Sequence, residues 1–198
     1  MNKTIYIHKL EFEITENHIK DEYGGYVMIG WEDPLMKAHA DVISYEGADI
    51  LEFGFGMGIS ANYIQLHNPK SHTICECHPQ VIEKLKEWAK DKPSVIIIEG
   101  YWINNVDKFE KYDGIFFDTH YDNHEKYFFE NYEKWMKPNA KMTFFNPKNY
   151  RRVKNYYKDS DNIKYQIIKT DKSDIINDPE YQSFDDEYYV PIVTQSNY

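Results

Sequence analysis

The sequence lacks the usual features of membrane, secreted and nucleic-acid-binding proteins. No segment approaches the roughly 20 apolar residues of a membrane span, and the first residues have no signal-peptide core. Lys and Arg number 23 against 33 Asp and Glu, a net charge of −10, whereas nucleic-acid binding draws on clustered cations. We therefore expect a soluble, cytoplasmic protein with a small cationic or zwitterionic substrate and with no membrane or nucleic-acid partner.

Cysteine is also scarce. Cys75 and Cys77 are the only two, and they lie two positions apart on one expected strand, where an extended backbone disfavours a disulfide bridge. His72 and His78 are close in sequence, but a single strand cannot wrap four ligands around a zinc ion. We expect reduced thiols and no metal site.

Aromatic residues, by contrast, are abundant. They make up 17% of the 198 residues, 18 of them Tyr, so there is ample apolar surface for a core. With no repeat and no low-complexity linker, residues 1–198 are expected to form one domain, in which residues 1–46 supply a lead-in and a lid helix. The sequence leaves the oligomeric state open, a homodimer included.

Strand-like and helix-like segments alternate through the middle of the chain. Asp33-Pro34 predicts a helix start and Gly47 its end, while Pro138-Asn139 predicts a turn into a strand. Residues 4–15 suit either a short hairpin or an irregular lead-in. The expected strands are 48–53, 72–77, 94–98, 113–118 and 140–146, and the expected helices are 33–45, 59–67, 79–90 and 123–136. Such alternation predicts a parallel, doubly wound α/β sheet with helices on both faces.

The tail of the chain breaks this alternation. A helix is expected at 149–158, followed by strands at 163–169 and 188–194 with no helix between them. Two late strands of this kind suit an antiparallel hairpin added to one edge of the sheet. The predicted fold is therefore Rossmann-like, with seven mostly parallel strands and an antiparallel C-terminal hairpin.

Three alternate glycines, Gly54, Gly56 and Gly58, follow the expected strand 48–53 and precede a helix. Glycine permits positive φ and close backbone approach to a ligand, so the run predicts a cofactor-binding turn. A dinucleotide fingerprint would place its third glycine where Ile59 stands, which disfavours a pyrophosphate. A purely structural turn is the alternative.

Glu76 strengthens the cofactor interpretation. It closes the next expected strand, 22 positions after Gly54, close to the spacing of about 20 at which an acidic residue takes ribose hydroxyls. The alternative is an ordinary solvated carboxylate at a strand end.

Five segments resemble guanidinoacetate N-methyltransferase and the related fungal protein arginine δ-N-methyltransferases. They include the W-E-x-P-x-M block at Trp31 and the Y-D-x-I-x-x-D-T block at Tyr112, which are more specific than the glycine turn. The segments are 26–36, 51–58, 74–79, 99–102 and 112–119. The resemblance implies a class I methyltransferase that uses S-adenosylmethionine and releases S-adenosylhomocysteine.

The resemblance also implies which residues contact the cofactor. Residues 53–58 would line its methionine moiety, Glu76 its ribose, and the segments at 77–78 and 101–102 its adenine. Met28 and Met36 would lie near the sulfonium, although core packing is an alternative for methionine. The full set is Met28, Met36, Phe53, Gly54, Phe55, Gly56, Met57, Gly58, Glu76, Cys77, His78, Tyr101 and Trp102.

Glu32 and Asp118 are the expected catalytic pair. Asp118 follows an apolar strand at the crevice where the strand order reverses, and Glu32 precedes the lid helix. A guanidinium presents its donors in a fixed fork that carboxylates match, and it is a poor nucleophile until it loses a proton. We expect the pair to orient the acceptor for in-line transfer and one member to take the proton; which one is open.

The predicted function is methylation of a guanidino nitrogen on a small molecule such as guanidinoacetate or arginine. His120, Asn146 and Pro147 stand where the family contacts its substrate with other groups, and His120 is either a second proton acceptor or an exposed loop residue. Alternatives are a protein arginine or another small amine as acceptor; the sequence shows no added recognition domain. A nucleic-acid methyltransferase and a catalytically silent binder are disfavoured.

Overall fold

The computed structural model describes residues 7–120, 122–146, 156, 163–169 and 187–194. Its main sheet has seven strands in the order β6-β5-β4-β7-β8-β10-β9. These strands are β4 (Asp49–Phe53), β5 (Ser71–Glu76), β6 (Val95–Glu99), β7 (Tyr112–Phe117), β8 (Met136–Phe144), β9 (Ile163–Lys169) and β10 (Glu187–Thr194). The helices are α1 (Asp33–Ile43), α2 (Ile59–Leu66), α3 (Pro79–Ala89) and α4 (Glu125–Asn131).

The direction of the strands confirms the predicted fold class. Strands β4 to β8 pair in parallel, and β10 pairs antiparallel with both β8 and β9. The strand order runs outward from β4 through β5 to β6 and from β7 through β8. The carboxyl ends of β4 and β7 therefore flank the point at which the order reverses, where open α/β sheets bind ligands.

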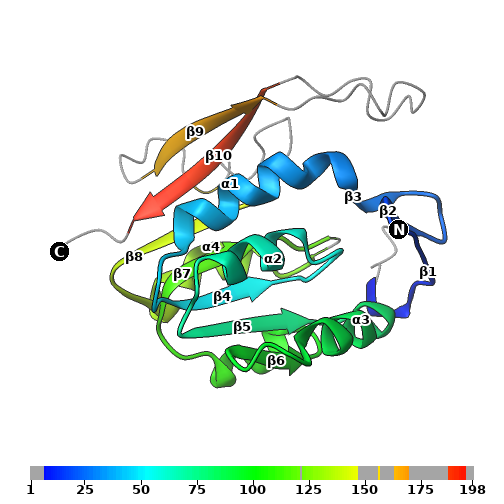
Figure 1. The fold of residues 1–198 in the computed structure, drawn as a ribbon, viewed down its shortest axis with the longest axis horizontal. Helices are drawn as coiled ribbons and strands as arrows, with labels where there is room; N and C mark the ends of the chain where they lie inside the picture. The colour runs from blue at the N-terminus through cyan, green and yellow to red at the C-terminus, as the bar shows by residue number, and fades with distance from the viewer. Residues whose placement is uncertain (1–6, 121, 147–155, 157–162, 170–186, 195–198) are drawn as a thin grey trace.

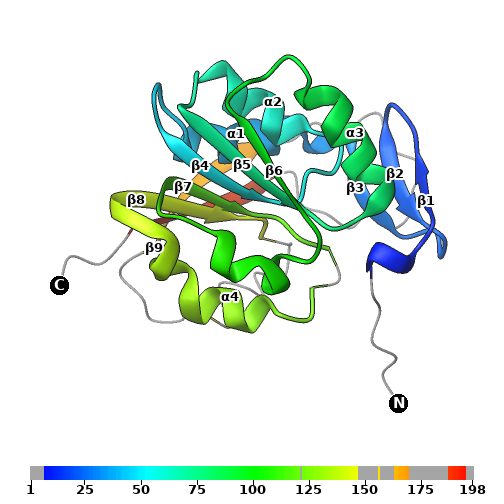
Figure 2. The same ribbon diagram turned by 90° about the horizontal axis from the view of Figure 1, so that it is seen from below.

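Alternate residues of the central strands supply the cores on the two faces of the sheet. Ile50 and Phe116 pack with α1 in one cluster, whereas Leu51 and Phe117 pack with α4 in the other. This period of two is expected of strands buried on both faces. Figures 1 and 2 show α1 and α4 on opposite sides of the sheet.

The N-terminal region forms a second sheet that the sequence did not predict. It has three antiparallel strands, β1 (Phe12–Ile14), β2 (His18–Asp21) and β3 (Tyr26–Ile29), preceded by a short 3-10 helix, η1 (Ile7–Lys9). Its apolar side chains pack against α3 and the glycine turn in a third core cluster. In Figures 1 and 2 it lies at the same end of the molecule as α3.

Two predicted boundaries were wrong. The strand expected at 140–146 begins at Met136, because Pro138-Asn139 is absorbed as an irregularity inside β8 rather than as a turn before it. Asn139 adopts a φ of 65°, a conformation that Asn tolerates better than most residues. The helix expected at 123–136 is α4 followed by a 3-10 helix, η4 (Tyr132–Trp135).

Two more short 3-10 helices connect the main elements. The helix η2 (Gly30–Glu32) stands before α1, and the helix η3 (Trp102–Lys108) lies in the link before β7. The helix expected at 149–158 and the predicted substrate residue Pro147 lie outside the described residues, apart from position 156. None of the helices in the described ranges is long and apolar enough to cross a membrane.

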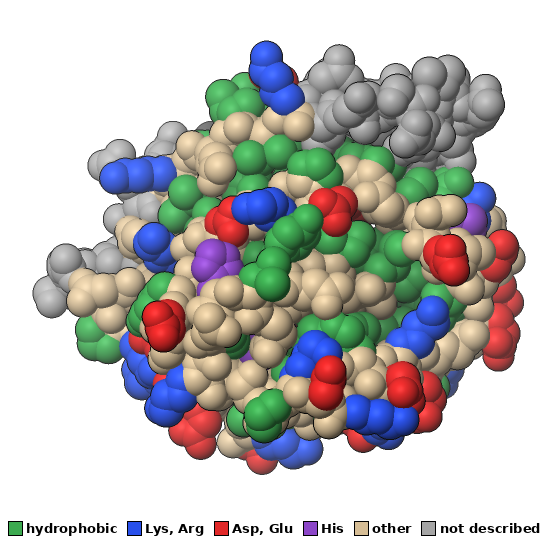
Figure 3. Space-filling view, viewed as in Figure 1, with side chains coloured by type: hydrophobic (Ala, Val, Ile, Leu, Met, Phe, Trp, Pro, Cys, Tyr) green, Lys and Arg blue, Asp and Glu red, His purple; other side chains and the backbone are tan. Residues whose placement is uncertain are grey.

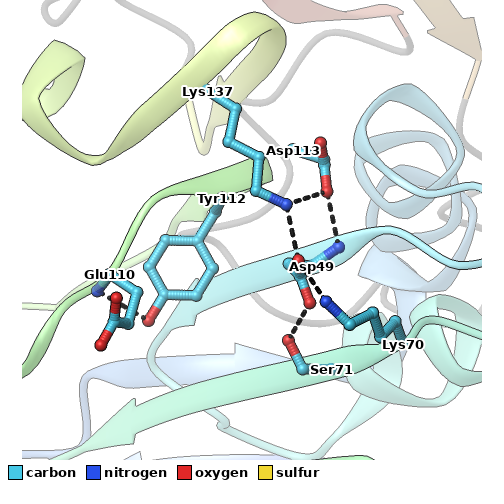
Figure 4. A network of polar contacts seen from close by, with 7 residues as sticks. All are labelled: Asp49, Lys70, Ser71, Glu110, Tyr112, Asp113 and Lys137. Carbon is cyan, nitrogen blue, oxygen red and sulfur yellow. Dashed lines mark hydrogen bonds and ion pairs between the residues drawn. The ribbon is translucent and has the colours of Figure 1, made fainter.

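A polar network ties together the amino ends of the central strands, opposite the carboxyl ends (Figure 4). Lys137 Nζ lies 2.5 Å from Asp49 Oδ2 and 2.7 Å from Asp113 Oδ2, and Asp113 accepts a hydrogen bond from the backbone N–H of Asp49. Elsewhere, on the face drawn in Figure 3, basic and acidic side chains of the described residues are interspersed.

Candidate functional site

A pocket lies at the carboxyl ends of β4, β5, β6 and β7, where the sequence predicted the cofactor. Its walls come from four parts of the chain: the N-terminal sheet, the glycine turn, the ends of β5 and β6, and the segment after β7. The lining includes Ile7, Phe12, Val27, Met28, Gly54, Phe55, Gly56, Ser60, Cys75, Glu76, Cys77, His78, Val81, Gly100, Tyr101, Trp102, Phe116, Asp118, Thr119, His120 and Asp122.

The glycine turn is tightly enclosed. Gly54 has a φ of +86°, and a side chain there would clash with the backbone carbonyl oxygen of Asp118. At Gly56, with a φ of +54°, an added Cβ would lie 2.5 Å from Met28 Sδ. Position 54 therefore requires glycine for conformation and for space, and position 56 requires it for conformation.

Glu76 is buried at the end of β5 and holds the turn in place. Its Oε2 accepts a hydrogen bond from the N–H of Phe55 at 2.8 Å, and its Oε1 accepts from the N–H groups of Cys77 at 2.7 Å and His78 at 2.8 Å. A carboxylate offers about four acceptor sites, so Glu76 keeps capacity for a hydroxyl donor in the pocket that it lines.

The N-terminal segment forms a wall of the pocket. Phe12 stacks on His78 with ring centroids 3.6 Å apart, and Gln80 Oε1 accepts from the N–H of Phe12 while Gln80 Nε2 donates to its carbonyl oxygen. His78 Nε2 lies 2.8 Å from the Leu10 carbonyl oxygen, which makes Nε2 the protonated nitrogen. These contacts bring Ile7 and Phe12 to the pocket.

The wall expected to face adenine is made of Cys77, Tyr101 and Trp102, all of which line the pocket. Burial, reinforced by the charge of Glu76, raises the pKa of the Cys75 thiol to about 12, and the same two causes raise the pKa of Cys77. Both thiols are free and stay protonated at neutral pH.

Glu32 and Asp118 interact electrostatically although 86 positions separate them in sequence. Glu32 ends η2 with 8% of its surface exposed, and its Oε1 accepts a hydrogen bond from the N–H of Ile29 at 3.2 Å. Burial, followed by repulsion from Asp118, raises the pKa of Glu32 to about 8. Glu32 therefore keeps its proton at neutral pH, and unlike Asp118 it is not among the residues that line the pocket.

The other expected substrate residues differ in position. His120 lines the pocket two residues after Asp118. Asn146 follows β8 and is 4% exposed, with neither side-chain polar atom hydrogen-bonded to any described residue. Asn146 is not part of the pocket lining. Just before it, the hydrogen bonding between the β7 and β8 chain segments continues, because the N–H of Phe145 donates to the carbonyl oxygen of Phe117.

Several expected cofactor residues lie behind the wall of the pocket rather than on it. Phe53 is fully buried among aromatic rings, and Met36 is fully buried on the core-facing side of α1. Gly58 caps α2 beneath the ring of Phe55, and the backbone N–H of Met57 donates to Met28 Sδ at 3.1 Å.

Sequence reasoning missed several residues on the wall. Phe12 and Val27 belong to the unpredicted sheet, and Ser60 starts α2. Thr119 and Asp122 follow Asp118 in the same segment. Their hydroxyl and carboxyl groups could therefore have been predicted to lie at the site.

A buried polar chain lies beneath the glycine turn. Glu52 and His72 are completely buried, with Glu52 Oε2 2.9 Å from His72 Nε2, and Ser60 donates to Glu52 Oε1. Gln65 Nε2 lies 3.1 Å from His72 Nδ1. These contacts fix the start of α2 against β4 and β5.

The residues that form the pocket fit S-adenosylmethionine. The glycine turn leaves no room for Cβ atoms, Glu76 has acceptor capacity at the ribose position, and an aromatic wall stands after β6. Across the described part of the chain, no three His, Cys, Asp or Glu side chains are arranged to hold a metal ion.

Comparisons with known proteins agree with this geometry. The model of the family described as guanidinoacetate N-methyltransferase matches residues 6–170. Protein arginine N-methyltransferase 2 of Candida glabrata is 41% identical over 123 residues, 57% of this chain and 28% of that protein. The Saccharomyces cerevisiae protein of the same name is 35% identical over 161 residues, 73% of this chain and 38% of that protein. The chain thus spans about a third of the length of these relatives.

Solved structures support the fold alone. Spermidine synthase from Thermotoga maritima aligns with a TM-score of 0.65 at 16% identity, covering 99% of this chain and 74% of that one. Precorrin-6y C5,15-methyltransferase from Geobacter metallireducens aligns with a TM-score of 0.61 at 12% identity, covering 82% and 88%.

Proposed function

The chain belongs to the guanidinoacetate N-methyltransferase family of S-adenosylmethionine-dependent enzymes, and on that premise we propose that it methylates a guanidino nitrogen of a small molecule. The observation that supports the proposal is a link between two acids: burial, and then the charge of Asp118, which lines the pocket, raise the pKa of Glu32. Two carboxylates suit a planar cation whose donors form a fixed fork.

The bound cofactor supplies an electrophilic methyl group on a sulfonium. Around it, Glu76 would accept hydrogen bonds from the ribose, and Met28 with the glycine turn would enclose the methionine end. Tyr101 and Trp102 would form the adenine wall. Met36, Phe53, Met57 and Gly58 would act from behind this wall, by holding the turn and α1 in place.

The acid pair would bind and orient the acceptor. Because Glu32 keeps a proton in the free protein, an incoming guanidinium cation would favour loss of that proton and would then lie between two carboxylates. The ionised carboxylate nearest the reacting nitrogen would accept the proton that this nitrogen loses on methylation. Asp118 lines the pocket, so we assign it that role. His120 would contact the far side of the acceptor, and Asn146 would act from behind the lining of the pocket.

A second acceptor class has a specific observation in its favour. Relatives 32–41% identical to this chain are named protein arginine N-methyltransferase 2. The side chain of a protein arginine presents the same guanidinium to the same two carboxylates, so the acid pair does not separate these candidates.

Mass spectrometry with a panel of acceptors tests the proposal. Guanidinoacetate, arginine, decarboxylated arginine and an arginine-containing peptide would each be incubated with S-adenosylmethionine, and the product would be fragmented to locate the added methyl group. Asp118→Asn should cut turnover at least about 100-fold, whereas Glu46→Gln, at an exposed turn, should not. Methylation of the peptide alone would favour the protein substrate, and no methylated guanidine would refute the proposal.

A further inference from the structure

We propose that Asp122 is a positioning residue, which fixes the segment carrying Asp118 against the Trp102 wall of the pocket. The consequence for turnover rests on the proposed function, but the contacts themselves do not. Asp122 was not among the residues expected from the sequence, and it does not need to touch the acceptor to play this part.

Three donors converge on this one carboxylate. Trp102 Nε1 donates to Asp122 Oδ2 at 2.6 Å, and Thr119 Oγ1 donates to the same oxygen at 3.0 Å. The backbone N–H of His124 donates to Oδ1 at 2.7 Å. The side chain is only 2% exposed although the residue lines the pocket, so little water is available to replace a lost bond.

The site requires an acceptor at both oxygens. An asparagine has only one acceptor oxygen, so its NH₂ group would face either the donors of Trp102 and Thr119 or the N–H of His124. Asp122→Asn is nearly isosteric, yet in either orientation it sets an NH₂ group against a donor and replaces the carboxylate by a weaker, neutral acceptor.

Both sides of this link have further contacts. Trp102 also packs edge-to-face against Phe53 and Phe117, with ring centroids 5.7 and 5.9 Å apart. Thr119 lies just beyond the last ladder bond of its strand, which the N–H of Asp118 makes with the carbonyl of Phe53 at 3.1 Å. Loss of Asp122 should thus leave the indole in this aromatic packing, while it removes one anchor of the segment that carries Asp118.

The first experiment measures binding and turnover separately. Asp122→Asn should lower kcat about 10- to 100-fold, since small misplacements of catalytic groups have effects of this size, while affinity for S-adenosylhomocysteine changes less than about threefold. Thr119→Val, which removes one hydroxyl, should lower kcat in the same direction by a smaller factor. Glu130→Gln, an exposed carboxylate on α4, is the matched control and should leave both values unchanged.

A second pair of variants tests the link itself. Trp102→Phe keeps an aromatic ring but removes the indole donor, so the double variant with Asp122→Asn should turn over no more slowly than the less active of the two single variants. If the two substitutions lowered kcat independently, so that their factors multiply in the double variant, the proposal would be overturned. So would wild-type kcat in Asp122→Asn, or a loss of cofactor affinity as large as the loss of kcat.

A spectroscopic readout separates this proposal from the proposed function. The indole Nε1–H resonance of Trp102, assigned with Trp102→Phe, should shift upfield and exchange faster with solvent in Asp122→Asn but not in Glu130→Gln. If the wild type methylates no guanidine, the proposed function fails, and this resonance together with those of Thr119 decides the positioning role. Unchanged resonances would overturn it, and shifts at both residues would support it.

Discussion

Glu32→Gln should stabilise the free protein while abolishing its proposed activity. Burial and the charge of Asp118 raise the pKa of Glu32 from 4.5 to about 8. At pH 7 the folded protein therefore keeps a proton on this carboxyl that the unfolded chain releases. As far as this carboxyl is concerned, the free energy of unfolding is highest below about pH 4.5 and falls as the pH rises towards 8.

The size of the effect follows from the width of that pH range. One pH unit corresponds to about 1.4 kcal/mol, and 2.5 units separate 4.5 from pH 7, so the carboxyl costs about 3 kcal/mol at pH 7. Glutamine cannot ionise and keeps an oxygen for the N–H of Ile29. For a chain of this length, about 3 kcal/mol corresponds to a Tm increase of roughly 6–12 °C.

Thermal and urea unfolding of both proteins from pH 4.5 to 9 would measure this difference. The stability advantage of Glu32→Gln should be near zero at pH 4.5, grow through pH 7 and level off above about pH 8. Glu46→Gln, at an exposed turn, controls for the loss of one negative charge. An advantage that is constant with pH, or a less stable Glu32→Gln, would refute the assignment of a buried, proton-holding carboxyl.

Three further predictions concern other parts of the structure. Glu76→Gln should weaken binding of S-adenosylhomocysteine by about 1–3 kcal/mol, since its NH₂ would face backbone donors; calorimetry giving wild-type affinity would remove it from the site. Burial alone would raise the pKa of Asp49 and Asp113, but hydrogen bonds, Lys137 among their donors, hold both below their ordinary values. Lys137→Met should thus lower the free energy of unfolding by about 1–3 kcal/mol at pH 7, and this difference should vanish as the pH falls through the lowered pKa values of the two carboxyls, below their ordinary 3.8; a deficit that persists there would contradict the ion-pair explanation. Gly54→Ala should reduce both Tm and turnover, and a variant with wild-type values in thermal melts and methylation assays would contradict the steric clash.

The central sheet was predictable because its signals are local. Apolar segments bounded by Gly47, the glycine turn and Pro79 predicted the alternation of strands and helices. Parallel strands then bring their carboxyl ends to the same edge of the sheet, independently of the loops. Glu76 and Asp118 could thus be placed at one edge of the sheet from their positions at strand ends alone.

The N-terminal sheet was not predictable in the same way. Its strands have three or four residues, too few for a clear alternation. What holds β1 in place is distant in sequence: the side-chain amide of Gln80 bonds both backbone groups of Phe12. Tertiary contacts of this kind leave no periodic signal.

The burial of Glu32 and the role of Asp122 were likewise hidden. A glutamate before a helix is usually solvated, and nothing local distinguishes one that is buried at the end of η2 and repelled by a distant aspartate. Asp122 resembles an ordinary residue before a helix, and its partner Trp102 comes from another strand end. In both cases the proposed role rests on the environment rather than on the residue type.

The glycines of the turn lie against different kinds of neighbour. Gly54 lies against the backbone carbonyl of Asp118, and backbone cannot rotate away as a side chain can. Gly56 lies against Met28 Sδ, the end of a flexible side chain. A methyl group at 54 must therefore displace the segment that carries Asp118, whereas at 56 it can be relieved by a methionine rotamer, apart from the strain of positive φ. The motif that marks the glycine turn in the sequence thus also sets how closely that turn approaches Asp118.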